Sequence, residues 1–223
     1  MLQDVLVAIL EVISGIRVEH RKLRKEFYIW IIKMMSNFLK WGRFLFQKGT
    51  VPISKKGRKI KMRYNKIRKM DISNGPGVRV SIFMQGCAFN CKNCFNPETH
   101  DFKGGKEFTD ETINRVLELC DNENVEGLSI LGGEPMHPNN IEGTTKLVKA
   151  FKEKYPNKNI WAWSGYKFDR DLENKDAMNY IDVLVDGQFV ESEKNPTLEW
   201  KGSSNQRVID VKESRKCHKV ITL

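Results

Sequence analysis

Three cysteines within eight residues, Cys87, Cys91 and Cys94, constrain this chain more than any other feature of its sequence. Residues 78–85, which precede them, are mostly apolar and read as a strand, and Gly86 ends that strand. The thiols therefore lie on a loop at the end of a strand, where α/β proteins usually place their chemistry. Clustered thiolates are soft ligands that suit zinc, copper(I) or an iron–sulfur cluster.

The number of ligands leaves two kinds of site open. Structural zinc sites use four protein ligands, often as two Cys-x-x-Cys pairs. This chain has no second pair, although His100 is available as a fourth ligand. A four-iron cluster held by three thiolates would instead keep one iron open for another ligand. An open coordination position is typical of catalytic rather than structural metal sites.

Beyond the cysteines, strand patterns alternate with helix patterns. We expect further strands at residues 127–131, 159–163 and 181–185. We expect helices at residues 109–120, 140–154 and 169–178. This alternation predicts βαβ units with a parallel sheet, which is an α/β fold. The pattern alone does not distinguish a partial (β/α) barrel from an open, doubly wound sheet.

Candidate ligand-binding residues follow three of these strands. In Gly132-Gly-Glu-Pro135, two glycines allow a ligand to approach the backbone, and Glu134 offers a carboxylate for an ammonium group. Ser164 and Asp186 lie at the carboxyl ends of the next two strands, the side of a parallel sheet on which ligands bind. Capping of the strand ends is the alternative interpretation of these two residues.

The charge of the chain is divided unevenly. The net charge of +10 would suggest a nucleic-acid or membrane partner if it were spread over the whole chain. Residues 1–61 contain 14 Lys and Arg against 4 Asp and Glu, whereas residues 62–223 contain 24 of each kind. We therefore predict a basic helical extension at 1–61 and a catalytic domain at 62–223 that has no basic signature for nucleic acid.

Within the extension, residues 26–46 are apolar and aromatic with polar residues at steps of three and four, which is typical of an amphipathic helix. Two lysines and an arginine in this stretch argue against a helix that spans a membrane. A helix lying on a membrane surface is one interpretation, and a helix packed on a partner or on the domain is the favoured one. A third hypothesis places the natural start at Met62, so that residues 1–61 are not part of the native protein.

The spacing Cys-x3-Cys-x2-Cys resembles the signature of the radical S-adenosylmethionine (SAM) enzymes. The resemblance is closer to one branch, the activating enzymes of anaerobic ribonucleoside-triphosphate reductase. It extends in family order from about residue 62 to about residue 209, through these segments: Asp71-Ile-Ser-Asn-Gly-Pro-Gly77, Gly86 to Thr99, Gly132-Gly-Glu-Pro-Met-His-Pro138, Ile160 to Tyr166, Val183 to Phe189 and Trp200-Lys-Gly-Ser-Ser-Asn-Gln206.

The resemblance implies a partial (β/α) barrel of the radical SAM type, a [4Fe-4S] cluster and SAM. It implies that Cys87, Cys91 and Cys94 bind the cluster. It also implies that the residues contacting SAM come from the cysteine loop and the strand ends: Asn93, Cys94, Phe95, Gly132, Gly133, Glu134, Ser164 and Asp186. Many members of the superfamily have an aromatic residue directly before the third cysteine. Asn93 occupies that position here, and the aromatic residue is Phe95.

The activity that the resemblance implies is the formation of a glycyl radical. A donor such as flavodoxin or ferredoxin reduces the cluster, and SAM is cleaved to methionine and a 5′-deoxyadenosyl radical. That radical removes hydrogen from a glycine in the large subunit of the reductase. Because the five cysteines are an odd number with three clustered, they do not form a secreted disulfide framework, and we expect a cytoplasmic enzyme.

Two other functions stay open on the sequence. One is an activating enzyme for a different glycyl-radical enzyme, such as pyruvate formate-lyase. The other is a zinc-stabilised binding module in which the basic residues 1–61 contact a membrane or nucleic acid.

Overall fold

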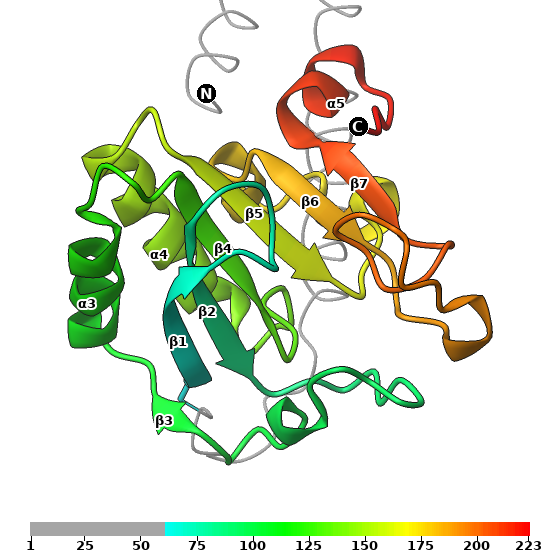
Figure 1. Ribbon diagram of the computed structural model, residues 1–223, viewed down its shortest axis with the longest axis horizontal. Helices are drawn as coiled ribbons and strands as arrows, with labels where there is room; N and C mark the ends of the chain where they lie inside the picture. Colours follow the sequence, from blue (N-terminus) through cyan, green and yellow to red (C-terminus); the bar gives the residue numbers. More distant parts are fainter. Residues whose placement is uncertain (1–60) are drawn as a thin grey trace, which may run out of the picture. The chain divides into compact units, whose positions relative to one another are not determined.

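Four parallel strands form the centre of the fold (Figure 1). They are adjacent in the sheet in chain order: β2 (Arg79–Gln85), β4 (Gly127–Gly132), β5 (Asn159–Ser164) and β6 (Val183–Asp186). The structure is a computed structural model that describes residues 61–223. Within these residues, the four strands predicted from the sequence are confirmed to within two residues at each end. The predictions for residues 1–61 fall almost entirely outside the described residues.

Antiparallel strands extend the sheet on both sides. Next to β2 lies β1 (Arg63–Asp71), which also pairs with the short β3 (Lys106–Glu107), and next to β6 lies β7 (Arg207–Asp210). The result is a mixed seven-stranded sheet in the order β3-β1-β2-β4-β5-β6-β7, and its two edges do not pair with one another to close a barrel. The α/β class is therefore confirmed, with a sheet that is open.

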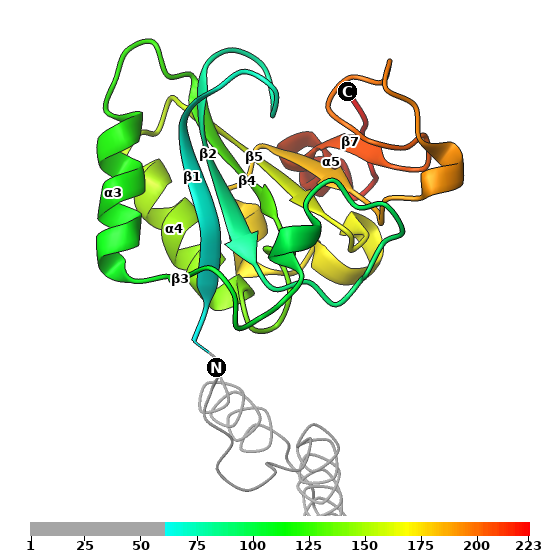
Figure 2. The same ribbon diagram turned by 60° about the horizontal axis from the view of Figure 1, so that its bottom comes forward.

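Two amphipathic helices cover one face of this sheet (Figure 2). The first, α3 (Asp110–Cys120), begins with a capping box in which the backbone N–H of Thr109 donates to Thr112 Oγ1 at 3.2 Å. The second is α4 (Ile141–Lys154). Their buried residues join alternate residues of the parallel strands in one core, because side chains at every second strand position point to the same face: Val80, Ile82, Met84, Val116, Leu128, Ile130, Leu147, Phe151, Ile160, Ala162 and Leu184.

The prediction of a third helix at residues 169–178 was wrong. The chain instead forms a π-helical turn, η2 (Phe168–Leu172), and a 3-10 helix, η3 (Asp176–Asn179). Polar residues separate the buried pair Phe168 and Leu172 from the buried pair Ala177 and Met178, so no continuous apolar stripe is available to a helix. The remaining helices are short: η1 (Pro97–Thr99), η4 (Glu191–Glu193) and α5 (Val211–Cys217).

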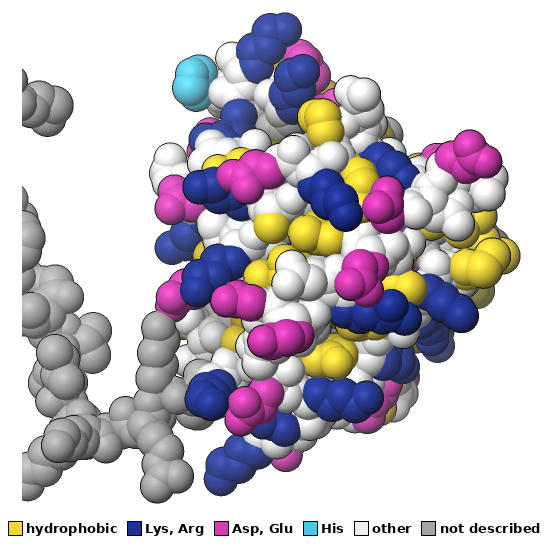
Figure 3. All heavy atoms as spheres, turned by 90° about the vertical axis from the view of Figure 1, so that its left-hand side faces the viewer, with side chains coloured by type: hydrophobic (Ala, Val, Ile, Leu, Met, Phe, Trp, Pro, Cys, Tyr) yellow, Lys and Arg dark blue, Asp and Glu magenta, His cyan; other side chains and the backbone are white. Residues whose placement is uncertain are grey.

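The surface of the described residues mixes both signs of charge. Figure 3 shows Lys and Arg side chains interspersed with Asp and Glu over the face that includes α3. Within residues 61–223, no helix has the length and apolar character needed to cross a membrane. Residues 26–46 lie outside the described part of the chain.

The other face of the sheet is built around a buried arginine. Arg79 is fully buried, and its guanidinium donates to Ser129 Oγ at 2.7 Å and to the carbonyl oxygens of Leu128 and Asn159 at 3.0 and 3.3 Å. It also lies over the Trp161 ring, 5.8 Å from the centroid. Burial lowers the pKa of Arg79 to about 10, so the group still carries its charge at neutral pH. This one side chain therefore connects β2, β4 and β5 near the amino ends of the three strands.

We predict that Arg79→Leu lowers the free energy of unfolding by roughly 2–4 kcal/mol, because the substitution leaves buried acceptors on two strands without their donor. Arg79→Lys should cost less, since a single ammonium group replaces only part of the fork. Urea denaturation of the whole protein would measure both. Arg115→Leu is the matched control, because Arg115 is exposed on α3 and pairs only with Glu118. Equal stability of the Arg79 and Arg115 variants would contradict the prediction.

Candidate functional site

A cavity of about 500 Å³ opens where the carboxyl ends of the parallel strands meet the loop that follows β2. Eight of the ten residues predicted to bind the cluster or SAM line it: Cys87, Cys91, Cys94, Phe95, Gly132, Gly133, Glu134 and Ser164. The four parallel strands point the same way in Figure 1, which brings loops that are distant in sequence to one end of the sheet. The parallel register therefore gathers the site that the sequence spreads over 78 positions from Cys87 to Ser164.

The cysteine loop (residues 86–101) is closed at its base by the backbone. The N–H of Gly86 donates to the carbonyl of Thr99 at 2.8 Å, and the N–H of Cys87 donates to the carbonyl of His100 at 3.1 Å. Within the loop, the N–H of Cys94 donates to the carbonyl of Cys91 at 3.2 Å. These contacts keep the loop compact after the end of β2. All three thiols line the same cavity.

The three thiols are partly buried and free of disulfides. Burial raises the pKa of Cys87 to about 11 and also raises the pKa of Cys94, so neither thiol is a ready nucleophile at neutral pH. The backbone N–H of Asn96 points at Cys94 Sγ from 3.4 Å, a contact that would favour a thiolate once a metal is bound. Such thiols suit metal ligation better than covalent catalysis.

Within residues 61–223, no three His, Cys, Asp or Glu side chains are grouped closely enough to hold a single ion. Thiols spread around one cavity fit a larger group, in which each thiolate binds a different iron. Three thiols on one cavity therefore agree with the donor set of an iron–sulfur cluster.

Two glycines allow the cysteine loop to lie directly on the neighbouring strand ends. A Cβ atom on Gly133 would come within 2.7 Å of the Gly86 carbonyl oxygen, and one on Gly165 would come within 2.5 Å of the Phe89 ring. Real Cβ atoms do not make contacts this close, so any side chain at either position would push the loop away. The glycines after β4 and β5 thus serve the close approach of two backbones as well as any approach by a ligand.

Glu134 is fully buried, and both of its carboxylate oxygens already accept hydrogen bonds. Oε1 accepts from the N–H of Met136 and from Ser164 Oγ, both at 2.8 Å, and Oε2 accepts from the N–H of Gly165 at 2.7 Å. Burial raises the pKa of this carboxyl to about 7, and the three donors keep it from rising further. The side chain therefore links the loop after β4 to the loop after β5.

Asn93 and Asp186 are not among the residues that line the cavity. Asn93 has a left-handed backbone and its side chain contacts Glu191. Asp186 is fully buried at the end of β6, where it accepts from Arg207 Nε at 2.9 Å and from the N–H of Phe168 at 2.7 Å. The role of both residues in binding SAM stays a prediction.

The segment that joins β6 to β7 covers one side of the cavity. The Phe189 ring meets Phe95 edge to face at 5.1 Å, and Gln188 Nε2 donates to the carbonyl of Phe89 at 3.3 Å. Farther along the segment, the carbonyl of Trp200 accepts from Trp163 Nε1 at 2.7 Å, and the Trp200 ring packs on Trp161. Trp163 and Trp200 line the cavity, whereas Trp161 is buried behind them.

Sequence reasoning missed Asn140, a buried side chain at the start of α4. Its amide nitrogen donates to the carbonyls of Gln85 at 3.0 Å and Glu134 at 2.9 Å, so it joins the end of β2 to the turn after β4. The sequence identifies it as a residue suited to a helix N-terminus, but only the fold shows which carbonyls it reaches.

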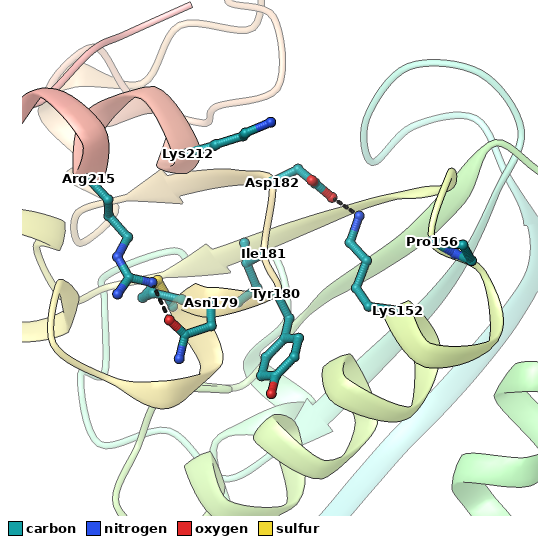
Figure 4. A pocket seen from close by; sticks show the side chains of 9 residues that line it. Lys152, Pro156, Asn179, Tyr180, Ile181, Asp182, Lys212 and Arg215 are labelled. Atoms are coloured by element: carbon teal, nitrogen blue, oxygen red, sulfur yellow. Dashed lines mark hydrogen bonds and ion pairs between the residues drawn. The ribbon is translucent and has the colours of Figure 1, made fainter.

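A second hollow of about 430 Å³ lies near the amino end of β6, bordered by α4 and α5 (Figure 4). Four of its polar side chains are already paired with one another in the structure. Lys152 Nζ pairs with Asp182 at 2.7 Å, and Arg215 Nη1 donates to Asn179 Oδ1 at 2.7 Å. It also lacks the thiols and strand ends that converge on the first cavity, which we take as the functional site.

The sequence matches a 4Fe-4S single cluster domain over residues 73–209, a span that includes the three cysteines and all the strand ends around the cavity. Several curated relatives carry the name anaerobic ribonucleoside-triphosphate reductase-activating protein. The protein from Vibrio cholerae is 38% identical over 148 residues, which cover 65% of this chain and 96% of the relative. The protein from Escherichia coli K12 is 38% identical over 150 residues, covering 66% and 97%. The protein from Enterobacteria phage T4 is 39% identical over 149 residues, covering 66% and 93%.

These matches extend over nearly the full length of the relatives, and they agree with the three thiols that line one cavity. The chain belongs to the family of anaerobic ribonucleoside-triphosphate reductase-activating proteins and contains a 4Fe-4S domain.

Proposed function

We propose that this protein is a radical SAM activating enzyme that generates a glycyl radical on the large subunit of anaerobic ribonucleoside-triphosphate reductase. The observation that carries the proposal is the shared cavity, since the three cysteine thiols and the turns after β4 and β5 face one space of about 500 Å³. The names of the relatives give the partner. The electron donor is a flavodoxin or ferredoxin, and the enzyme is cytoplasmic.

In this proposal Cys87, Cys91 and Cys94 each bind one iron of a [4Fe-4S] cluster, and the fourth iron is left for SAM. When bound, the cluster supplies the electron for reductive cleavage of SAM, which leads to removal of hydrogen from a glycine of the reductase. The chain itself positions these groups and keeps water out. Phe189 packed on Phe95 and Trp200 beside Trp163 line one side of the cavity, where they would help to exclude water once the reductase is bound.

The SAM contacts divide by position. Gly132, Gly133 and Ser164 line the cavity beside the thiols and would hold the methionine end, while Cys94 and Phe95 would lie along the rest of the molecule. Glu134 acts mainly by fixing the two turns, because its carboxylate already accepts three hydrogen bonds. Asn93 and Asp186 are also proposed to contact SAM; their side chains now contact Glu191 and Arg207, respectively.

The fold supports a partial (β/α) barrel of the radical SAM type, in which the open edges of the sheet leave room for a glycine-bearing loop of the reductase. We assign residues 62–223 to the catalytic domain and residues 1–61 to an extension. In support, the relatives are matched over 93–97% of their length by only 65–66% of this chain.

Anaerobic reconstitution followed by electron paramagnetic resonance (EPR) of the reduced protein tests this function. We expect a reduced four-iron signal whose shape changes when SAM is added, because SAM would bind the open iron. Cys91→Ala should lose both the signal and SAM cleavage. Cys217→Ala is the matched control and should retain both, since Cys217 is exposed at the end of α5. A protein that takes up zinc, or a cluster signal indifferent to SAM, would refute the proposal.

The choice of partner has its own test. The reconstituted protein, reductant and SAM should produce a glycyl-radical doublet in the EPR spectrum of the large reductase subunit, and none with pyruvate formate-lyase. A doublet with pyruvate formate-lyase alone would assign the protein to the other class of activating enzymes.

The burial of Glu134 predicts a pH effect on stability. Its pKa rises from an ordinary 4.5 to about 7 on folding, so between these values the folded protein holds a proton that the unfolded chain has released. The contribution of this group to the free energy of unfolding is fully present below pH 4.5. It falls as the pH rises from 4.5 to 7 and does not change further above pH 7. The fall amounts to about 3 kcal/mol.

Glu134→Gln removes the titrating group and should abolish this fall. Urea denaturation of the cluster-free protein between pH 5 and 8 would compare the variant with the wild type. Glu153→Gln, an exposed change on α4, should keep the pH dependence of the wild type. Parallel curves for the wild type and Glu134→Gln would show that the carboxyl is not destabilised by burial.

A further inference from the structure

His100 stands beside the first cysteine of the cluster loop and lines the same cavity as the three thiols. Its place is fixed by the backbone on both sides. Its carbonyl accepts from the N–H of Cys87 at 3.1 Å, and its own N–H donates to the carbonyl of Pro97 at 3.2 Å. The imidazole is therefore carried on the same closed loop base that positions Cys87.

The side chain has an unsatisfied polar atom. Nε2 of His100 is buried and has no hydrogen-bond partner among the described residues. Buried polar atoms normally have a partner, so an unpaired one in a residue that lines the cavity points to an acceptor on a group bound there. The nearby acid is already engaged, because Glu98 Oε1 pairs with Lys66 Nζ at 3.1 Å.

We propose that His100 Nε2–H donates a hydrogen bond to a sulfur of the [4Fe-4S] cluster held by Cys87, Cys91 and Cys94, and thereby raises the reduction potential of the cluster. The inference rests on the proposed function, since it requires the cluster. Sulfides and thiolates are the acceptors that such a cluster presents, and hydrogen bonds to them help to set its potential. Donation stabilises the reduced cluster more than the oxidised one, because the reduced cluster carries more negative charge.

The competing role for this histidine is to bind a metal ion directly as a fourth ligand. The sequence made His100 a candidate fourth ligand for zinc, yet within residues 61–223 no three metal-binding side chains are grouped around a single-ion position. A bond from His100 to the fourth iron would also occupy the position that SAM requires. A hydrogen bond satisfies the buried nitrogen and leaves that iron free.

The potential of the reconstituted cluster tests the inference through an EPR-monitored redox titration. His100→Phe should shift the midpoint potential to a more negative value at unchanged iron and sulfide content. His100→Gln, which keeps an N–H donor, should recover part of the shift. His137→Phe is the matched control, because His137 is a loop histidine that does not line the cavity, and it should leave the potential unchanged. A full cluster with the wild-type potential in His100→Phe would overturn the inference.

Pulsed EPR of the wild-type protein with ¹⁵N-labelled histidine tests the same contact without any variant, so the result does not depend on whether a variant folds. A weak nitrogen coupling to the reduced cluster is expected for an N–H···S contact. A strong coupling would indicate an iron–nitrogen bond, and no coupling would indicate no contact, so either result overturns the inference. Failure of the wild-type protein to assemble a cluster would instead refute the proposed function, and with it this inference.

Discussion

The cysteine loop rests directly on the glycine turn that ends β4, and the rest of the cavity depends on this backbone contact. The N–H of Gly133 donates to the carbonyl of Met84 at 2.8 Å, and the N–H of Glu134 donates to the carbonyl of Gly86 at 2.9 Å. Asn140 adds its amide across the same joint. Glu134 then extends the connection to the turn after β5. Three strand ends are thus held at fixed separations before any cofactor binds, which is how a site becomes preorganised.

The parallel core could be predicted from the sequence because its strands and helices are locally unambiguous. Strands β2, β4, β5 and β6 are apolar runs bounded by glycine or polar residues, and α3 and α4 have regular apolar faces. The flanking strands carry no such signal. In β1, apolar residues occur only at every third position among charged and polar ones, which is not a strand pattern, and β3 has only two residues. The strand structure of both therefore comes from pairing with neighbours.

The candidate site shows the same division. The cysteines, the glycines and Glu134 could be assigned to the site from their spacing and from their positions at strand ends, because these residue types are suited to metal and ligand binding. The partners of these residues could not. Nothing local to Glu134 indicates that Ser164, thirty positions later, would donate to its carboxylate. Likewise, the burial of Asp186 against Arg207 depends on β7 running antiparallel to β6, a pairing that the sequence pattern did not reveal.

The three tryptophans beside the cavity give this protein a built-in optical reporter. Of the five tryptophans in the chain, the three in the described residues are Trp161, Trp163 and Trp200, and their rings form one contiguous group. Two of them face the space that the thiols share. A strongly absorbing iron–sulfur chromophore in that space would accept their excitation energy. The emission of this group should therefore dim as the cofactor is assembled and recover as it decays, so that loading can be followed by fluorescence without any added dye.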